Sequence, residues 1–245
     1  RFTFKSTYHS INDKNQFIND IYVSNNQIIS IDLEKFQIKD GNEKEVMDYD
    51  IEEDYDIAKN KITSILNKQT EDARNQLAGN ISKSEFIEDK DNWFYENVLK
   101  ECTEHLFYKD WINYYNVHVT KNVLPPVFML EEIWVNYQKQ HEFNPPHTHN
   151  GLFTFVVFMK IPTHWKEQHA LPWLKDVKQP HASDFQFLLG NGQGLVEVIP
   201  FPLSPEDEGR ILFFPASLTH QVFPFYGTEE ERITISGNII PTHVH

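Results

Sequence analysis

Two histidines that stand two residues apart mark the part of the chain best suited to chemistry. The run Asn144-Pro-Pro-His-Thr-His149 comes directly before an apolar stretch, Leu152–Ile161, that has the composition of a strand. In an extended chain the side chains at positions i and i+2 point to the same face, so His147 and His149 can converge on one point. Two imidazoles placed in this way are suited to chelating a metal ion.

A third histidine, His220, ends the run Phe213-Phe-Pro-Ala-Ser-Leu-Thr-His220 and begins another predicted strand. A lone histidine at such a position is most often a hydrogen-bonded structural residue. Three histidines that converge favour a metal site instead. The sequence therefore predicts a metal centre formed by His147, His149 and His220.

An arginine with two hydroxyl residues follows the third histidine. Arg232, Thr234 and Ser236 alternate along a predicted strand and share one of its faces. An inward guanidinium is costly to bury without an anion, and its planar fork suits a carboxylate that a nearby hydroxyl can also bind. The alternative is an edge-strand arginine paired with the acidic run 229–231.

The second half of the chain has the sequence pattern of an antiparallel β architecture. Short runs of β-branched and aromatic residues are separated by Pro, Gly and Asn turns. Strands are predicted at 128–138, 151–161, 184–189, 195–199, 210–214, 220–225 and 231–240. Strands at this spacing indicate a sandwich or barrel, and the jelly roll is the version that most often holds a ligand in its mouth. The long loop 162–183 is predicted to be a lid, and its histidines are expected to be solvent-exposed.

The first half of the chain is predicted to contain both short strands and helices. Short strands are predicted at 20–24 and 27–31, and apolar residues recur at helical spacing over 52–77 and 92–108, with Asp91 placed to cap the second helix. We therefore expect a mainly β protein with a helical N-terminal part. Residues 1–125 would form an extension that braces the core, and residues 126–245 a jelly-roll domain.

The charge balance limits the choice of partners. The 245 residues carry 36 acids and 22 bases, a net charge of −14, and no basic strip stands out, so we expect no nucleic-acid partner. No apolar run approaches the ~20 residues that span a bilayer, and the first residues lack a signal peptide's apolar region. The single cysteine, Cys102, is expected to be a buried small hydrophobic residue. These features predict a cytoplasmic protein without a membrane partner.

Four blocks of sequence together resemble a known family. They are Trp134-Val-Asn-Tyr137, the His-x-His run that ends at His149, the Phe-Pro-Ala-Ser-Leu-Thr-His220-Gln-Val run, and Glu-Arg232-Ile-Thr-Ile-Ser-Gly-Asn238. In this order and spacing they are similar to the 2-oxoglutarate and iron(II)-dependent oxygenases common in marine bacteria and their phages. The resemblance covers roughly residues 130–240, and residues 1–125 contribute nothing to it.

The resemblance implies a fold, a reaction and a set of site residues. The fold would be a double-stranded β-helix, a cupin-like jelly roll whose open end holds iron(II) through His147 and His220, with no catalytic residue beyond the metal ligands. The residues implied to lie beside 2-oxoglutarate are Arg232, Thr234, Ser236, Asn136 and Tyr137. With O2, the expected outcome is hydroxylation of a small molecule, a peptide or a protein side chain, in the cytoplasm or, for a phage-encoded chain, in the host cytoplasm.

One departure from the superfamily pattern leaves alternatives open. A carboxylate usually stands two residues after the first histidine, where this chain has His149. His149 is either a third, neutral ligand or a residue that contacts substrate and leaves a metal position open. Two other classes also fit three histidines: a cupin-type metalloenzyme that uses no keto acid, and a non-enzymatic metal-binding jelly roll. An inward Arg232 disfavours the first, and the lack of a fourth ligand disfavours the second. The sequence does not determine the substrate or the oligomeric state.

Overall fold

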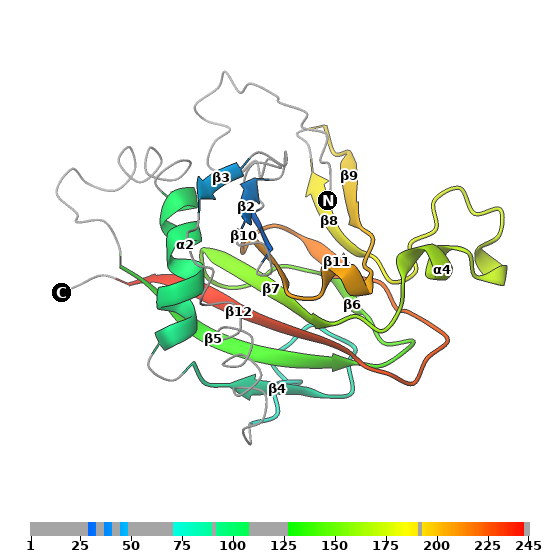
Figure 1. The fold of residues 1–245 in the computed structure, drawn as a ribbon, viewed down its shortest axis with the longest axis horizontal. Coiled ribbons are helices and arrows are strands. Elements are labelled where there is room, and N and C mark those ends of the chain that lie inside the picture. The colour runs from blue at the N-terminus through cyan, green and yellow to red at the C-terminus, as the bar shows by residue number, and fades with distance from the viewer. Residues whose placement is uncertain are drawn as a thin grey trace.

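The computed structural model describes residues 29–32, 37–40, 45–48, 71–89, 92–107, 127–190 and 193–242, and it shows two antiparallel β-sheets (Figure 1). The larger sheet has the strand order β3-β2-β1-β10-β7-β12-β5-β4, and the smaller has the order β6-β11-β8-β9. The strands are β1 (Ile29–Asp32), β2 (Gln37–Asp40), β3 (Glu45–Asp48), β4 (Ser84–Ile87), β5 (Val127–Gln138), β6 (Asn144–His147), β7 (Phe153–Lys160), β8 (Phe185–Gly190), β9 (Val196–Phe201), β10 (Arg210–Pro215), β11 (His220–Val222) and β12 (Arg232–Thr242).

The order of the last eight strands defines a jelly roll. From β5 to β12 the chain passes back and forth between the sheets, so that β5, β7, β10 and β12 lie in the larger one and β6, β8, β9 and β11 in the smaller. Within each sheet, strands that are distant in sequence become neighbours, as β12 does between β5 and β7. This winding is that of a double-stranded β-helix, and the predicted fold class is confirmed.

Alternation along the central strands gives the larger sheet two buried faces. On β5, Ile133 and Val135 belong to a core that a helical segment covers, whereas Trp134 and Asn136 face the space between the sheets. The covering segment consists of a π-helical turn, η4 (Tyr95–Leu99), and helix α2 (Lys100–Leu106), which lies across this face in Figure 1. A second core, centred on Phe187 and Phe214, joins the two sheets.

The second predicted helix is confirmed, and the first is not found where it can be checked. Of 52–77, residues 52–70 lie outside the described residues, and 71–77 form a bridge and turns because Ala73 pairs with Ser84 rather than with a helical neighbour. Helical structure over 93–106 matches the second prediction. Asp91 lies outside the described residues, and the Asp89 carboxylate accepts hydrogen bonds from the amides of Phe94 and Tyr95. Cys102 is fully buried, as predicted.

Strands from the N-terminal half extend the larger sheet on both sides. β1 pairs with β10, and β4 pairs with β5. The predicted strand at 27–31 therefore corresponds to β1, while 20–24 lies outside the described residues. The division of the chain at residue 125 stays a prediction.

Every strand predicted after residue 126 is present, although two details differ. β11 ends at Val222 instead of residue 225, and β6 was not predicted. The loop 162–183 contains helix α4 (Trp165–His169) and a 3-10 turn, η6 (Pro172–Leu174). Among the described residues, no helix is long and apolar enough to cross a membrane.

Candidate metal and anion site

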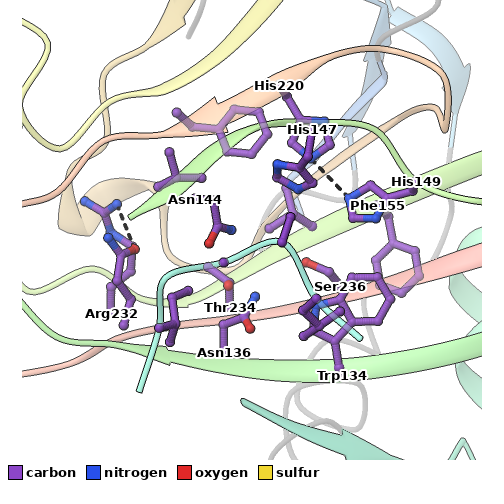
Figure 2. Close-up of a pocket in the computed structure, with 18 of the residues that line it drawn as sticks. Trp134, Asn136, Asn144, His147, His149, Phe155, His220, Arg232, Thr234 and Ser236 are labelled. Atoms are coloured by element: carbon purple, nitrogen blue, oxygen red, sulfur yellow. Dashed lines mark hydrogen bonds between the residues drawn. The ribbon is translucent and has the colours of Figure 1, made fainter. Parts of the chain in front are cut away.

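A pocket lies between the two sheets and contains the predicted site (Figure 2). It holds about 640 Å³ of space, including solvent at its mouth. Its walls are largely apolar and aromatic, and its polar lining residues are Asn136, Gln138, Asn144, His147, His149, His220, Arg232, Thr234 and Ser236. The segment Leu77–Ile81, from the N-terminal half, contributes part of one wall.

Three histidines meet at one end of this pocket. His147 ends β6 and pairs across the sheet with His220, the first residue of β11, while His149 lies just beyond β6. The ligand atoms of the three rings lie within 4.8 Å of one another, and within the described residues no other such group of His, Cys, Asp and Glu occurs. The Nε2 atoms of His149 and His220 are 3.1 Å apart. Two nitrogens bound to one ion at ~2.1 Å and about a right angle would have nearly this separation.

Backbone carbonyls fix the tautomers of two of the rings. His147 Nδ1 donates to the Pro145 carbonyl at 2.7 Å, and His220 Nδ1 donates to the Leu218 carbonyl at 2.9 Å. Since a carbonyl only accepts, each ring carries its proton on Nδ1 and directs the Nε2 lone pair toward the other histidines. Donation of the second ring nitrogen to a carbonyl is the usual support of a metal-binding histidine.

Burial keeps the three rings neutral, as metal ligands must be. It lowers the pKa of His147, lowers that of His149 to about 3 with a further contribution from His147, and lowers that of His220 well below its usual range. Neutral imidazoles offer lone pairs without competition from protons. The donor set therefore fits a divalent transition metal ion such as iron(II).

The guanidinium of Arg232 lies deeper in the same pocket, at the start of β12. The residue is 1% exposed, and its partners are neutral: Nη2 donates to the carbonyl of Ser183 at 3.0 Å and to the hydroxyl of Ser183, and Nη1 lies 3.4 Å from Gln138 Oε1. Its Nε is buried without a hydrogen-bond partner. Burial lowers the pKa of Arg232 to about 9, whereas the charge of Asp184 acts in the opposite direction. The guanidinium is thus an incompletely paired cation that an anion would stabilise.

The alternative pairing of Arg232 with residues 229–231 is wrong. Glu229 accepts a hydrogen bond from Gln140 at 2.7 Å, and Glu230 forms an ion pair with Lys160 at 2.8 Å. Because β12 is a central strand between β5 and β7, Arg232 points inward, away from the exposed turn that carries these acids.

The other predicted cosubstrate residues divide between the two faces of the sheet. Thr234, Ser236 and Asn136 line the pocket. Asn136 Oδ1 accepts from the Ser84 hydroxyl at 2.7 Å, which orients the amide of Asn136. Tyr137 is not among the lining residues: it packs on the opposite face of β5 against the helix-covered core, with Lys83 over its ring.

Sequence reasoning missed several residues of the site. Gln138 follows from the same alternation that places Trp134 and Asn136 in the pocket, so its position could have been read from β5. Asn144 lies between Arg232 and the histidines in Figure 2. It begins β6, which lacks the residue pattern of a strand because two of its four residues are proline. Ser183 carries no signal in the sequence, since its contact with Arg232 depends on how the chain closes.

Comparison with known proteins gives a family match over the jelly roll. Residues 132–238 match the family model described as "Putative 2OG-Fe(II) oxygenase". No curated protein sequence matches the chain.

Solved structures with similarity to the chain include three bacterial proteins. A prolyl-4-hydroxylase of Pseudomonas putida is 11% identical, with a TM-score of 0.40 over 77% of this chain and 84% of its own. An oxidoreductase of the 2OG-Fe(II) oxygenase family from Burkholderia pseudomallei is 10% identical, with a TM-score of 0.40 over 74% and 77%. A Shewanella oneidensis protein is 7% identical, with a TM-score of 0.27 over 51% and 64%.

The family match contains the four sequence blocks, the three histidines and Arg232, but not the wall segment Leu77–Ile81. The metal-site strands β6 and β11 lie inside residues 132–238, as does the part of β12 that carries Arg232, Thr234 and Ser236. The resemblance drawn from the motifs is therefore confirmed: the jelly-roll core of this chain is similar to the 2-oxoglutarate and iron(II) oxygenases, a family whose cofactors are Fe(II) and 2-oxoglutarate.

Proposed function

We propose that this protein is an iron(II) and 2-oxoglutarate-dependent dioxygenase of the hydroxylase type that acts on a small molecule or a protein side chain. One observation carries the proposal: three convergent histidines and a buried arginine without an acidic partner line the same pocket. A metal centre alone needs no such arginine. A metal centre together with a buried arginine fits a ligand that binds a metal at one end and presents a carboxylate at the other.

The histidines would hold the iron. Their Nε2 atoms are the ligands, with His147 and His220 held in the required tautomer by the carbonyls of Pro145 and Leu218. When bound, iron(II) with the keto acid supplies the oxidising chemistry, in which one O2 oxygen enters the substrate C–H bond and the other enters succinate as CO2 is lost. Because all three ligands are neutral, the ion would keep its full positive charge, which a dianionic keto acid offsets.

Arg232 would bind the distal carboxylate of 2-oxoglutarate. Burial strengthens this interaction because the local dielectric constant is low, and Ser183 and Gln138 orient the guanidinium. The hydroxyls of Thr234 and Ser236 and the amide of Asn136 provide further hydrogen bonds. Since the Ser84 hydroxyl already donates to Asn136 Oδ1, the Nδ2 group of Asn136 is left to donate to the cosubstrate.

Aromatic walls would keep bulk water from the reacting centre. Trp134 contacts the ring of His149 at a centroid distance of 5.5 Å, and Phe185 stacks on His220 at 5.5 Å. Side chains of this kind restrict the motion of the ligand histidines and keep the site dry. They favour a neutral substrate group over a charged one at the position next to the metal.

A metalloenzyme that uses no keto acid is the second candidate, because the three-histidine set contains no carboxylate. The buried Arg232 separates the two candidates, since it has no evident partner in a site without an anionic cosubstrate.

The test is to supply Fe(II), 2-oxoglutarate and isotopically labelled O2 to the protein with pools of small metabolites or peptides. Succinate release together with label in one product would support hydroxylation. His220→Ala should abolish both signals, while His105→Ala, on helix α2 away from the pocket, should retain them. A product that forms without 2-oxoglutarate would favour the second candidate, and an unlabelled desaturated or halogenated product would contradict the hydroxylase assignment.

A further inference from the structure

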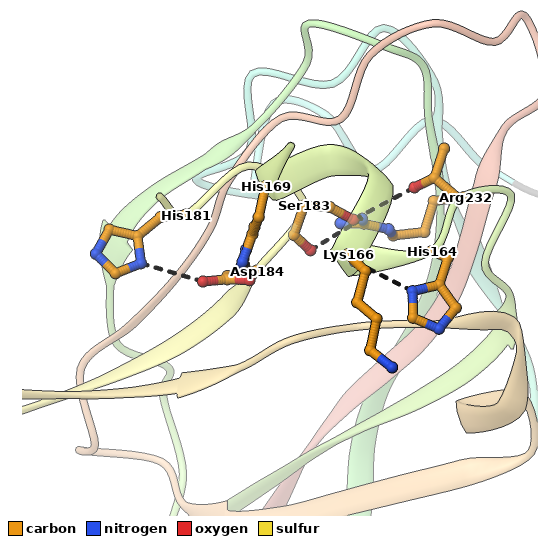
Figure 3. Close-up of polar contacts among 8 residues, drawn as sticks. His164, Lys166, His169, His181, Ser183, Asp184 and Arg232 are labelled. Carbon is orange, nitrogen blue, oxygen red and sulfur yellow. Dashed lines mark hydrogen bonds and ion pairs between the residues drawn. The ribbon is translucent and has the colours of Figure 1, made fainter. Parts of the chain in front are cut away.

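A buried carboxylate next in sequence to Ser183, the residue that binds Arg232, holds two histidines (Figure 3). The side chain of Asp184 is 1% exposed, and each of its oxygens binds a different ring: Oδ1 lies 2.8 Å from His169 Nε2, and Oδ2 lies 3.1 Å from His181 Nδ1. His169 belongs to α4 and His181 to the loop that follows it. The prediction that these histidines would simply face solvent is therefore wrong: both are anchored to an interior acid.

This cluster adjoins the residue that orients Arg232. Ser183 precedes Asp184 and has a positive φ of 74°, which a serine adopts only when its surroundings fix it. Its amide donates to the Pro224 carbonyl at 2.9 Å, and its own carbonyl and hydroxyl accept from Arg232 Nη2. The Asp184 amide donates to the His181 carbonyl at 3.0 Å, and the Asp184 carbonyl accepts from the Phe223 amide at 2.9 Å. The corner at residues 183–184 is thus fixed from both sides.

The two histidines also keep the Asp184 carboxylate from pairing with Arg232. Burial lowers the pKa of Arg232 overall, and the charge of Asp184 opposes that change, so the carboxylate is near enough to influence the guanidinium, yet the two groups form no ion pair. Both oxygens of Asp184 are occupied by imidazoles. A carboxylate that paired with Arg232 would compete with an anionic ligand for the guanidinium.

The groups that face Asp184 come from three elements: His169 from α4, His181 from the loop after it, and Arg232 from β12. The segment that carries both histidines is tied down elsewhere as well. Gln168 exchanges two hydrogen bonds with the backbone of Tyr226, and the Trp165 amide donates to the Leu203 carbonyl. This part of the predicted lid is therefore joined to Asp184, which directly precedes the pocket residue Phe185.

We propose that Asp184 is a positioning residue for cosubstrate binding: held by His169 and His181, it fixes the Ser183 corner that sets the orientation of Arg232 and leaves the guanidinium open to an anion. The inference rests on the proposed function, since the anion is taken to be 2-oxoglutarate. Asp184 itself touches neither metal nor ligand, and it acts through Ser183 and Arg232.

The test measures the Kd of 2-oxoglutarate for metal-loaded protein without O2, alongside the Kd of the metal. Asp184→Asn keeps the size of the side chain but removes its charge, and we expect it to weaken 2-oxoglutarate binding about fivefold or more while metal affinity changes less than twofold. The matched control is Asp207→Asn, which removes a second buried aspartate and its 2.9 Å ion pair with Arg210, and which should leave 2-oxoglutarate affinity unchanged. Unchanged affinity in Asp184→Asn, or an equal loss in Asp207→Asn, would overturn the proposal.

A double variant tests whether Asp184 acts through the arginine. If it does, adding Asp184→Asn to Arg232→Lys should cost little further affinity, whereas independent effects would multiply. Should Asp184→Asn fail to fold, His181→Gln removes one ion pair from a 30% exposed side chain, and a several-fold loss of affinity is again expected. A wild-type protein that binds metal but no 2-oxoglutarate would instead overturn the proposed function, an outcome distinct from a change confined to the Asp184 variants.

Discussion

Replacement of Arg232 by glutamine should weaken 2-oxoglutarate binding by about 30- to 150-fold. Removing one partner of a buried charge pair costs about 2–5 kcal/mol, and 1.4 kcal/mol corresponds to a tenfold change in Kd. We expect Arg232→Gln to reduce the binding free energy of 2-oxoglutarate by about 2–3 kcal/mol, the lower part of that range. The pocket opens to solvent, and two guanidinium nitrogens already bond to Ser183 and Gln138. Metal affinity should stay within twofold of wild type, since the arginine does not belong to the histidine group.

Isothermal titration of 2-oxoglutarate into metal-loaded protein without O2 measures this effect. Arg210→Gln is the matched control: Arg210 is also largely buried, but it pairs with Asp207 at 2.9 Å and does not line the pocket. It should lower the free energy of unfolding and leave the Kd unchanged. Equal affinities of wild type and Arg232→Gln for 2-oxoglutarate would refute the assignment of the arginine to the cosubstrate.

Two further predictions concern pH and the pocket wall. Burial lowers the pKa of His149 to about 3 and also lowers that of His220, so at acid pH the unfolded chain binds more protons than the metal-free folded protein. The Tm should therefore fall as the pH drops below about 6.5, the pKa of an unperturbed histidine. Bound metal should reduce this loss of Tm. A Tm of the metal-free protein that stays constant from pH 7 to pH 5 would contradict this. A Cβ on Gly79 would lie 2.4 Å from Asn144 Oδ1, so Gly79→Ala should lower the free energy of unfolding by about 1–3 kcal/mol in urea titrations, whereas Gly190→Ala, with nothing within 4 Å, should change it by less than ~0.5 kcal/mol. Equal effects of the two substitutions would contradict this prediction and show that Asn144 moves aside at no cost in stability.

The strands of the jelly roll could be predicted because their signals are local. Most are short runs of β-branched and aromatic residues bounded by turn residues. β6 could not be predicted, since two of its four residues are proline. It forms nonetheless because it is an edge strand, where a missing amide donor leaves few ladder bonds unmade.

The metal end of the site was easier to predict than its surroundings. His147 and His149 stand two residues apart, and strand alternation places Arg232, Thr234 and Ser236 on one face, as the pocket shows. The same alternation argues against Tyr137, which is adjacent to Asn136 and therefore points to the other side of the sheet. Contacts made by Ser183 and by the wall at Leu77–Ile81 join segments distant in sequence, and no local pattern encodes them.

The most direct test of the central claim is the visible spectrum of the protein without O2, recorded after addition of Fe(II) and then of 2-oxoglutarate. A keto acid that chelates iron(II) produces a weak charge-transfer band, and we predict that band for the wild type, its loss in His220→Ala, and its weakening in Arg232→Gln at limiting 2-oxoglutarate. A wild-type protein that binds iron stoichiometrically but shows no band at saturating 2-oxoglutarate would contradict the account and favour a metalloenzyme that uses no keto acid.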